Sequence, residues 1–282
     1  MLKIFADSTC DLSPELIERY DLTIIPLHIH LGEEAFEDGV NVTPDEIYAW
    51  SDAHNATPKT SAVSIAAMED LFSDCKECGD EIICFSISDG MSSTGQVMRV
   101  AAENVEYADK VHVVNSANLS TGIGLQVIEA AEMVKAGKNA EEILEHIEAI
   151  KPMVRASFVV DTLTFLHRGG RCSSVAALAG GVLKLHPRIV VEDGKMHASK
   201  KYRGRMPQVI LSYVKDMEED LKNAHDDRVF ITHSGCDQEI LNSVKEYLEG
   251  LHHFKEILIT RAGGVISSHC GPGTLGVLFI AG

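Results

Sequence analysis

The sequence predicts an α/β protein of two domains: an N-terminal α/β domain with a parallel sheet and a C-terminal α/β domain with a mixed or antiparallel sheet. The chain has 282 residues, more than one domain usually holds. Its first half alternates apolar runs with helical stretches, as crossover units do. Its second half contains an expected hairpin around Asp193-Gly194, which requires antiparallel pairing. We place the boundary near Lys151-Pro152, giving domains 1–152 and 153–282, with a possible crossover segment near 58–76.

Strand and helix signals follow each other along the first domain. Short runs rich in Ile, Val and Phe predict strands over 2–7, 22–30, 81–88 and 110–115. Amphipathic stretches, several with Ser or Thr at the cap and Pro in the first turn, predict helices over 13–20, 43–52, 64–74, 93–106, 119–137 and 139–151.

The second domain is less regular. The predicted elements are a strand over 153–161, a small-residue helix over 173–185, the hairpin over 188–204, a long helix over 206–223, a strand over 227–235, a helix over 238–251, a strand over 256–263 and a terminal glycine-containing stretch over 265–282. The hairpin distinguishes this half from the first, so the two sheets are expected to differ.

Charge and composition exclude several classes of function. The formal net charge of −17 argues against a nucleic-acid surface, which needs a basic stripe. The start of the chain lacks a signal-peptide pattern and no apolar run reaches the length of a membrane span, so no stable membrane insertion is expected. Seven cysteines spread over the chain fit reduced thiols and a cytoplasmic location, and the lone CxxC of Cys75 and Cys78 is interpreted as incidental. We predict no metal site and no cofactor.

Small polar residues follow three predicted strands, at the edge where parallel sheets bind ligands. The clusters are Asp7-Ser8-Thr9, the stretch from Ser88 to Thr94, and Asn115-Ser116. In the second cluster Ser92 and Ser93 open a helix and combine hydroxyls with free backbone amides, which suits a carboxylate or a phosphate. Each cluster can equally be explained as an ordinary helix cap.

The stretch "DTLTFLHRGGRCSS", residues 161–174, is also suited to an anion. Gly169-Gly170 permits close backbone approach, and Arg168 and Arg171 bring guanidinium donors. The alternative is an ordinary turn with surface ion pairs. No sequence pattern of a known nucleotide-binding loop, zinc protease or nucleophile elbow occurs in a fitting context.

An enzyme remains the alternative interpretation. Ser92 or Ser93 with His269 could act on an acyl or phosphate ester, as a hydrolase or as a phosphotransferase subunit, because the order of triad residues varies between folds. No carboxylate is assigned to orient that histidine.

Six motifs resemble, in order and spacing, the DegV family of bacterial lipid-binding proteins. They are "DSTCDL", "TPKTSAVS", "ISDGMSSTG", "VVNS", "FVVDTLTFLHRGGR" and "SSHCGPGTLG". The resemblance spans nearly the whole chain, and its most specific parts are the GGR element and the element from His269 to Gly276.

The resemblance implies a carrier without a catalytic centre of its own. The carrier would hold one long-chain fatty acid, such as palmitate, in a buried tunnel between the domains and present it to a separate ATP-dependent fatty acid kinase subunit, a step toward phospholipid metabolism. By motif, the carboxylate would be held by Thr60, Ser61, Ser92, Ser93, Arg171 and His269. The basic segment Lys200–Arg205, with Lys201, Arg203 and Arg205, resembles the surface on which the kinase docks. Small and apolar residues over 64–68 and 175–183 could line the tunnel.

The chain departs from the family pattern at four places near the expected site, one of which is Ser93, where the family usually has glycine. Ala62-Val63 follow the Thr-Ser pair where the family usually has Gln-Pro, and Asn115 replaces a usual aspartate. Asp89 adds a negative charge beside the expected carboxylate site.

Overall fold

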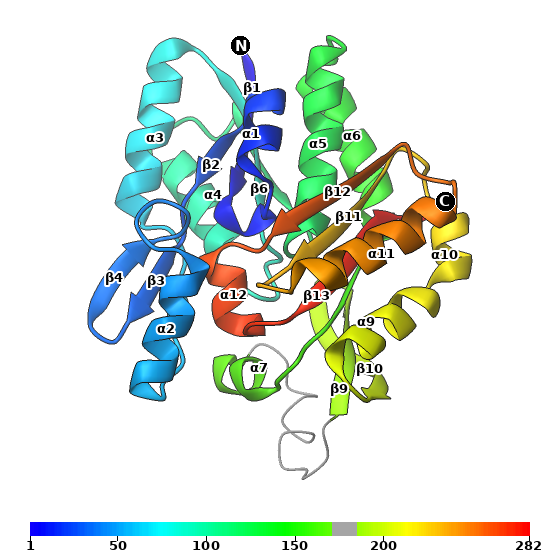
Figure 1. The fold of residues 1–282 in the computed structure, drawn as a ribbon. Helices are drawn as coiled ribbons and strands as arrows, with labels where there is room; N and C mark the ends of the chain where they lie inside the picture. The colour runs from blue at the N-terminus through cyan, green and yellow to red at the C-terminus, as the bar shows by residue number, and fades with distance from the viewer. Residues whose placement is uncertain (171–184) are drawn as a thin grey trace.

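The computed structural model describes residues 1–170 and 185–282 and confirms the α/β fold (Figure 1). Its first sheet is parallel and has the strand order β2-β1-β6-β7. Its members are β1 (Leu2–Asp7), β2 (Thr23–Ile25), β6 (Glu81–Ser86) and β7 (Val111–Asn115). The crossover pattern of the first half therefore produces the parallel sheet that the sequence predicts.

The predicted single strand over 22–30 is divided in two by Pro26. Residues before the proline form β2, and residues after it form β3 (His28–Leu31) in a separate antiparallel sheet with the order β4-β3-β5. Proline has no N–H to donate to a ladder, so it stands at the point where the chain changes sheets. The partners of β3 are β4 (Glu34–Glu37) and β5 (Lys59–Ser61).

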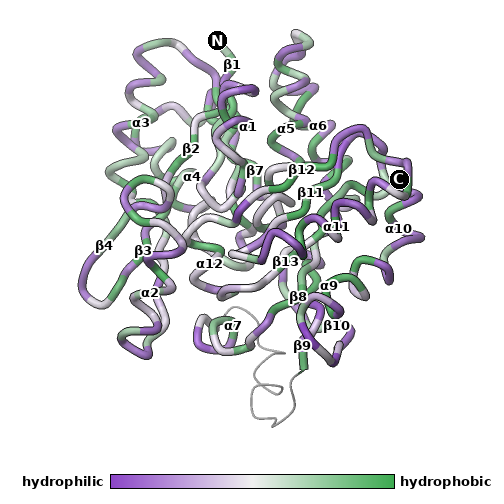
Figure 2. The backbone as a smooth tube through the Cα atoms, in the orientation of Figure 1, coloured by the Kyte–Doolittle hydropathy of each residue, from purple (hydrophilic) through white to green (hydrophobic). Residues whose placement is uncertain are grey.

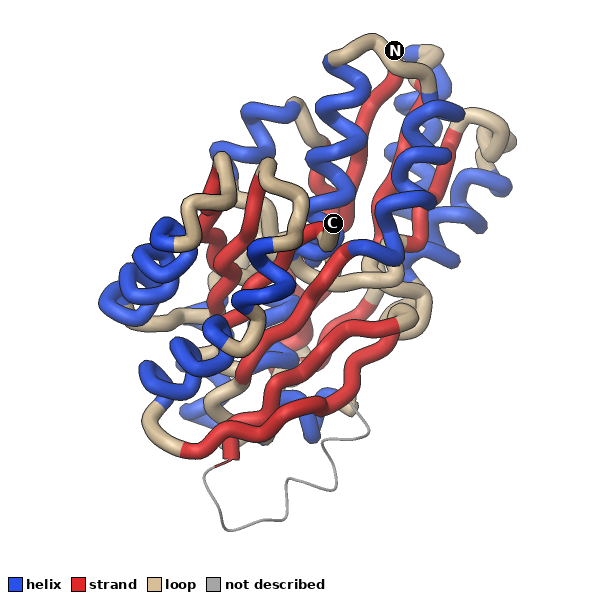
Figure 3. The backbone as a smooth tube through the Cα atoms, turned by 90° about the vertical axis from the view of Figure 1, so that its right-hand side faces the viewer, coloured by secondary structure: helices blue, strands red, loops and turns tan. Residues whose placement is uncertain are grey.

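The second sheet is mixed, with the strand order β10-β9-β8-β13-β11-β12. Its members are β8 (Val154–Val159), β9 (Leu185–Glu192), β10 (Lys195–Arg203), β11 (Arg228–His233), β12 (Glu256–Arg261) and β13 (Leu275–Ile280). Only the pair β11 and β12 is parallel. The hairpin of β9 and β10 turns at Asp193 and Gly194, both at positive φ as such a tight turn requires, and forms one edge of the sheet (Figure 3).

The helices cover the faces of these sheets. They are α1 (Pro14–Tyr20), α2 (Pro44–His54), α3 (Ile65–Cys78), α4 (Thr94–Asn104), α5 (Thr121–Lys135), α6 (Ala140–Ile150), α7 (Thr164–Gly169), α9 (Met206–Lys215), α10 (Glu218–Lys222), α11 (Gln238–Gly250) and α12 (Gly264–Cys270), with short 3₁₀ turns η1 (Ser8–Cys10) and η2 (Lys151–Met153). The predicted helix over 173–185 falls on residues 171–184, which lie outside the described part of the chain, and on Leu185, the first residue of β9.

The prediction of one continuous helix over 206–223 was wrong. Asp216 and Met217 separate α9 from α10: Asp216 keeps helical backbone angles, and the departure comes at Met217, with φ −101 and ψ 7. Met217 is buried in the core, and the carboxylate of Asp216 accepts bonds from Lys200 and Tyr202 of β10. These tertiary contacts outweigh the local helical propensity of the stretch.

Helix α5 lies between the two large sheets and is buried along most of its length. Ten of its 15 residues are buried, and it packs against β1 and β6 on one side and β8 and β13 on the other. A single apolar cluster therefore contains Ile83 of the first sheet and Leu278 of the second. The division into domains at residue 152 stays a prediction, because both sheets share this core.

Hydrophilic residues gather on the outer loops and helix faces (Figure 2). Of the helices in the described part of the chain, none is both long and apolar enough to cross a bilayer. Helix α12, near the C-terminus, packs against α7 and against α2, β3, β5 and η1 of the first half (Figure 1). This crossing brings residues from both ends of the chain to one place.

Candidate functional site

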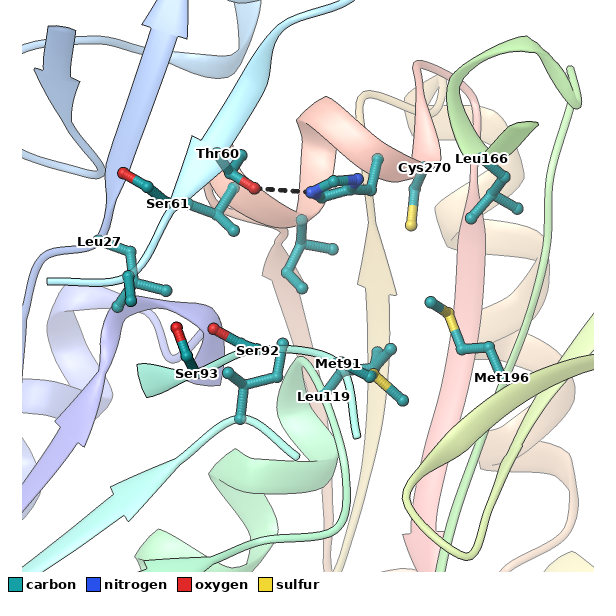
Figure 4. Close-up of a pocket in the computed structure, with 15 residues that line it drawn as sticks. Leu27, Thr60, Ser61, Met91, Ser92, Ser93, Leu119, Leu166, Met196 and Cys270 are labelled. Carbon is teal, nitrogen blue, oxygen red and sulfur yellow. Dashed lines mark hydrogen bonds between the residues drawn. The ribbon is translucent and has the colours of Figure 1, made fainter. Parts of the chain in front are cut away.

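A cavity of about 300 Å³ lies where α12, β5 and the β6–α4 turn meet (Figure 4). It is lined by Leu27, Thr60, Ser61, Ala62, Ile87, Met91, Ser92, Ser93, Leu119, Leu166, Met196, Val265, Ile266, His269 and Cys270. These residues come from both halves of the chain.

The cavity has a polar end, formed by Thr60, Ser61, Ser92, Ser93 and His269. The labelled hydroxyls lie on one side of the close-up (Figure 4). Ser61 and Ser93 are exposed, and the other members are partly exposed, so this end opens to solvent. Hydroxyl and imidazole groups are donors, and an open end that carries several of them is suited to an anionic group.

Thr60 and His269 are joined directly. The Oγ1 of Thr60 lies 2.8 Å from the Nε2 of His269. Thr60 pairs with Ile29 in the small sheet, and His269 stands in the last turn of α12. The neighbouring Ser61 also lines the cavity, and its Oγ lies 3.0 Å from the Nε2 of His30.

The β6–α4 turn positions Ser92 and Ser93. The backbone amides of Met91 and Ser92 both donate to the carbonyl of Ser88, and the Oγ of Ser92 lies 2.9 Å from the Oγ1 of Thr94. Ser93 is the N-cap residue of α4 but makes no side-chain cap bond, so its hydroxyl is available at the cavity mouth.

The tip of the β9–β10 hairpin docks on the same turn. The hydroxyl of Ser88 donates to the carbonyl of Gly194 over 2.7 Å. A Cβ atom on Gly90 would lie 2.7 Å from that carbonyl, so glycine permits the contact. The contact brings Met196, two residues beyond the tip, to the cavity.

The other end of the cavity is an apolar wall. Figure 4 shows Leu166, Met196, Met91 and Cys270 on the side away from Ser61. Leu166 and Cys270 are buried, and burial raises the pKa of the Cys270 thiol to about 12. A thiol with so high a pKa stays neutral and acts as a small apolar group.

Five of the six predicted carboxylate-binding residues are brought together by the fold, all at the polar end: Thr60, Ser61, Ser92, Ser93 and His269. The sixth, Arg171, lies outside the described residues. Its neighbour Arg168 is exposed and donates to the Oγ1 of Thr57 over 3.3 Å.

In the other two predicted polar clusters, Asp7 and Asn115 accept hydrogen bonds from backbone amides. The buried carboxylate of Asp7 accepts bonds from Thr9 and from the amide of Ile87. Asn115 accepts bonds from the amides of Asp89 and Ala117.

Sequence reasoning missed most of the apolar wall. The stretch over 64–68 does not line the cavity, because Ile65 is exposed and Met68 packs in the core against α4 and the first sheet. The stretch over 175–183 lies outside the described residues. The actual lining residues, such as Leu27 and Met196, are single side chains on separate elements, and no pattern in the sequence marks them.

Asp89 does not face the cavity as an unpaired charge. Its carboxylate accepts a bond from Arg99 over 2.7 Å. The ion pair offsets the negative charge that the sequence places near Ser92 and Ser93.

The basic segment Lys200–Arg205 lies at the end of β10. Lys201, Arg203 and Arg205 are exposed, whereas Tyr202 is buried. Lys200 is paired with Asp216 over 2.5 Å, and within residues 1–170 and 185–282 no ion pair engages the other three cations.

Among the described residues, no group of three or more His, Cys, Asp and Glu side chains could hold a metal ion, and six cysteines are free. Cys75 and Cys78 of the CxxC pair are both free, the first buried and the second exposed.

Comparison with known proteins gives the same fold along the whole chain. A DegV domain-containing protein from Deinococcus radiodurans is 31% identical over 276 residues, which cover 98% of this chain and 97% of that protein. A DegV family protein from Thermus thermophilus, described by its fatty acid binding, superimposes with a TM-score of 0.90 at 28% identity and 99% coverage of both chains. A stearic acid-binding protein from Eubacterium ventriosum gives a TM-score of 0.87 at 29% identity, with 100% of this chain and 98% of that chain covered.

The sequence pattern of one family matches all 282 residues. Its description reads "Uncharacterised protein, DegV family", and the match runs over residues 1–282. With this match, the curated relative and the shared fold, the chain belongs to the DegV family.

Proposed function

We propose that this protein binds one long-chain fatty acid, with the carboxylate at the polar end of the cavity and the acyl chain against the apolar wall. The observation that carries the proposal is the division of one cavity into an open end with hydroxyls and an apolar end with buried Leu and Cys and partly buried Met side chains. An amphipathic ligand with a single anionic head group fits this division. The fatty acids bound by the solved relatives support it.

The Thr60–His269 pair suggests how the head group is held. If the imidazole donates from Nε2 to Thr60 Oγ1, the hydroxyl proton of Thr60 is directed elsewhere and can be given to a carboxylate oxygen. Ser92 and Ser93 supply further hydroxyls from the other side, and Arg171 a charge-assisted bond. Each hydrogen bond to a charged group contributes about 1.5–3 kcal/mol.

The acyl chain supplies the larger part of the affinity. Each buried CH₂ contributes about 0.8 kcal/mol before the costs of association are subtracted. Met91 of the β6–α4 turn and Met196 of β10 both line the apolar wall, and methionine side chains can adjust their shape to a bound chain.

The chemistry on the bound acid belongs, in this proposal, to a partner. A separate ATP-dependent fatty acid kinase subunit would dock on the basic segment and phosphorylate the carboxylate, which the open polar end leaves within reach. The protein itself would act as a cytoplasmic carrier. The Nε2 of His269 is hydrogen-bonded to the hydroxyl of Thr60 and not to Ser92 or Ser93, which argues against a serine nucleophile activated by this histidine.

Native mass spectrometry of protein purified from cells tests the proposal. We expect a mass increment equal to one long-chain fatty acid, identified after extraction, and no turnover of acyl or phosphate esters by the purified protein. A protein that carries no lipid, takes up none from added palmitate and hydrolyses esters would replace the carrier with the enzyme.

A further inference from the structure

Helix α12 begins without a cap of its own. Its N-cap residue is Gly263, which has no side chain to accept a bond, and the first amides of any helix lack partners within the helix. The helix has seven residues and carries four residues of the cavity lining: Val265, Ile266, His269 and Cys270. Whatever satisfies these first amides therefore also fixes part of the cavity.

Two carboxylates from the first forty residues of the chain supply the missing acceptors. The amide of Gly263 donates to Asp11 over 2.8 Å, and the amide of Gly264 donates to Asp38 over 2.6 Å. The bonds span 252 and 226 residues of sequence. A carboxylate at a helix start is favourable both as an acceptor and for the helix dipole.

Each carboxylate is itself oriented by a hydroxyl. Ser120 donates to the second oxygen of Asp11, and Ser8 donates to the second oxygen of Asp38 over 2.8 Å. Asp11 and Asp38 are only 4% and 3% exposed, and burial raises the pKa of both. Burying two carboxyl groups costs free energy of folding. Proteins accept such costs mainly at functional sites.

The helix start is pressed closely against this support. A Cβ atom on Gly264 would lie 2.5 Å from Ile29 Cδ1, 2.8 Å from Ile47 Cδ1 and 2.9 Å from the Oδ1 of Asp38. An added Cβ would therefore force either the start of the helix or these buried side-chain ends to shift away from the contact.

Displacement at the start of α12 reaches its end, because a helix rises about 1.5 Å per residue and His269 lies only about 7.5 Å beyond Gly264. We propose that Asp11 and Asp38 are positioning residues of the cavity: by holding the first amides of α12 they set His269 against Thr60 and hold the helix at the cavity wall. The inference deepens the proposed fatty-acid binding and rests on it, but the position of His269 can be measured without ligand.

The test compares graded variants at one carboxylate. Asp38→Ala removes the acceptor, whereas Asp38→Asn keeps an oxygen for the amide of Gly264 but loses the charge and the second oxygen that accepts from Ser8. Gly264→Ala disturbs the same contact while both acids are left unchanged. Asp80→Ala is the matched carboxylate control, since Asp80 is 3% exposed and binds the N-terminal amine, and Gly250→Ala is the glycine control, with nothing within 4 Å of the added Cβ.

Two measurements are made on each variant: the ¹⁵N and ¹H signals of the His269 ring in ligand-free protein, assigned with His269→Gln, and the Kd for palmitate. We expect Asp38→Ala and Gly264→Ala to shift the ring signals and to weaken binding about tenfold, with Asp38→Asn intermediate. Both controls should leave signals and Kd unchanged, even where Asp80→Ala lowers the melting temperature.

Ring signals and affinity that stay at control values in Asp38→Ala and Gly264→Ala would overturn the positioning role. If Asp38→Ala fails to fold, Asp38→Asn and Gly264→Ala decide the question. If the wild type binds no palmitate but the His269 signals still shift in the variants, the proposed function is wrong and the positioning of His269 by the carboxylates stands.

Discussion

The Oγ1 of Thr60 and the Nε2 of His269 lie 2.8 Å apart, although 209 residues separate them in the chain. The contact exists because β5 joins the small sheet around β3 and α12 packs against that same sheet. The polar end of the cavity is thus assembled from both ends of the sequence, and its chemistry depends on how α12 is seated.

The Thr60–His269 pair should behave as one unit in ligand binding. Thr60→Val and His269→Gln should each weaken palmitate binding about tenfold or more, and the double variant should lose less than the sum of the two, because the second change acts on a network already broken. Isothermal titration calorimetry of the four proteins gives the coupling. Thr23→Val, at an exposed position of β2, is the control and should bind as the wild type does. Strictly additive losses would argue against a shared network.

The buried Asp7 should give the protein an unusual pH dependence of stability. Burial raises the pKa of Asp7 from 3.8 to about 6, so between these values the folded state holds the proton that the unfolded state releases. The free energy of unfolding therefore falls as pH rises through this window, by about 3 kcal/mol for this group. Asp11 and Asp38 act in the same direction, since burial raises the pKa of each.

Urea unfolding of the wild type and Asp7→Asn at pH 4.5 and 7.5 checks this sign. The free energy of unfolding of Asp7→Asn, relative to that of the wild type, should be higher at pH 7.5 than at pH 4.5. Asp80→Asn should show no such change between these two pH values, because the hydrogen bond from Lys3 lowers the pKa of Asp80, and its contribution is lost only as pH falls below the ordinary value of 3.8. The same trend in both variants would contradict the assignment of Asp7 as a destabilised buried acid.

The fold class could be predicted from the sequence because it depends on patterns that repeat over many residues. The alternation of apolar runs and capped helices in the first half is local, and the turn at Asp193-Gly194 carries its own signal. Two errors arose where a single residue or a tertiary contact decides the outcome. Pro26 sends the chain from one sheet to another, and the burial of Met217 ends a helix that propensity would continue.

The polar end of the cavity was predictable and the apolar wall was not. Thr60, Ser92 and His269 stand in motifs whose order and spacing could be compared with a family. Met196 lies at the cavity beside the hydrogen bond between Ser88 and the carbonyl of Gly194, and Leu27 lies where the chain passes from the first sheet to the small sheet after Pro26. When a contact between distant parts of the chain places a side chain, the residues next to it in the sequence do not reveal its position.

The basic segment should affect the partner and not the ligand. Arg203→Glu with Arg205→Glu should leave palmitate affinity unchanged, because neither residue lines the cavity, but should slow phosphorylation by a cognate fatty acid kinase through weaker docking. Lys222→Glu with Lys245→Glu changes the net charge equally at exposed positions of α10 and α11 and serves as the control. Equal phosphorylation rates of both double variants at limiting carrier concentration would refute the docking role.

Arg171 should distinguish acid from alcohol. If its guanidinium binds the carboxylate, Arg171→Ala should weaken palmitate binding roughly tenfold and hexadecanol binding much less, since only the acid loses a charge-assisted bond. Gly170→Val should weaken both ligands to a similar extent, because Gly170 has φ +67 and a β-branched residue resists that conformation. Displacement titrations with both ligands on wild type, Arg171→Ala and Gly170→Val give the ratio directly. An equal loss of acid and alcohol in Arg171→Ala would make Arg171 a structural brace, and the carboxylate would then have to be held by the Thr60, Ser92 and His269 groups alone.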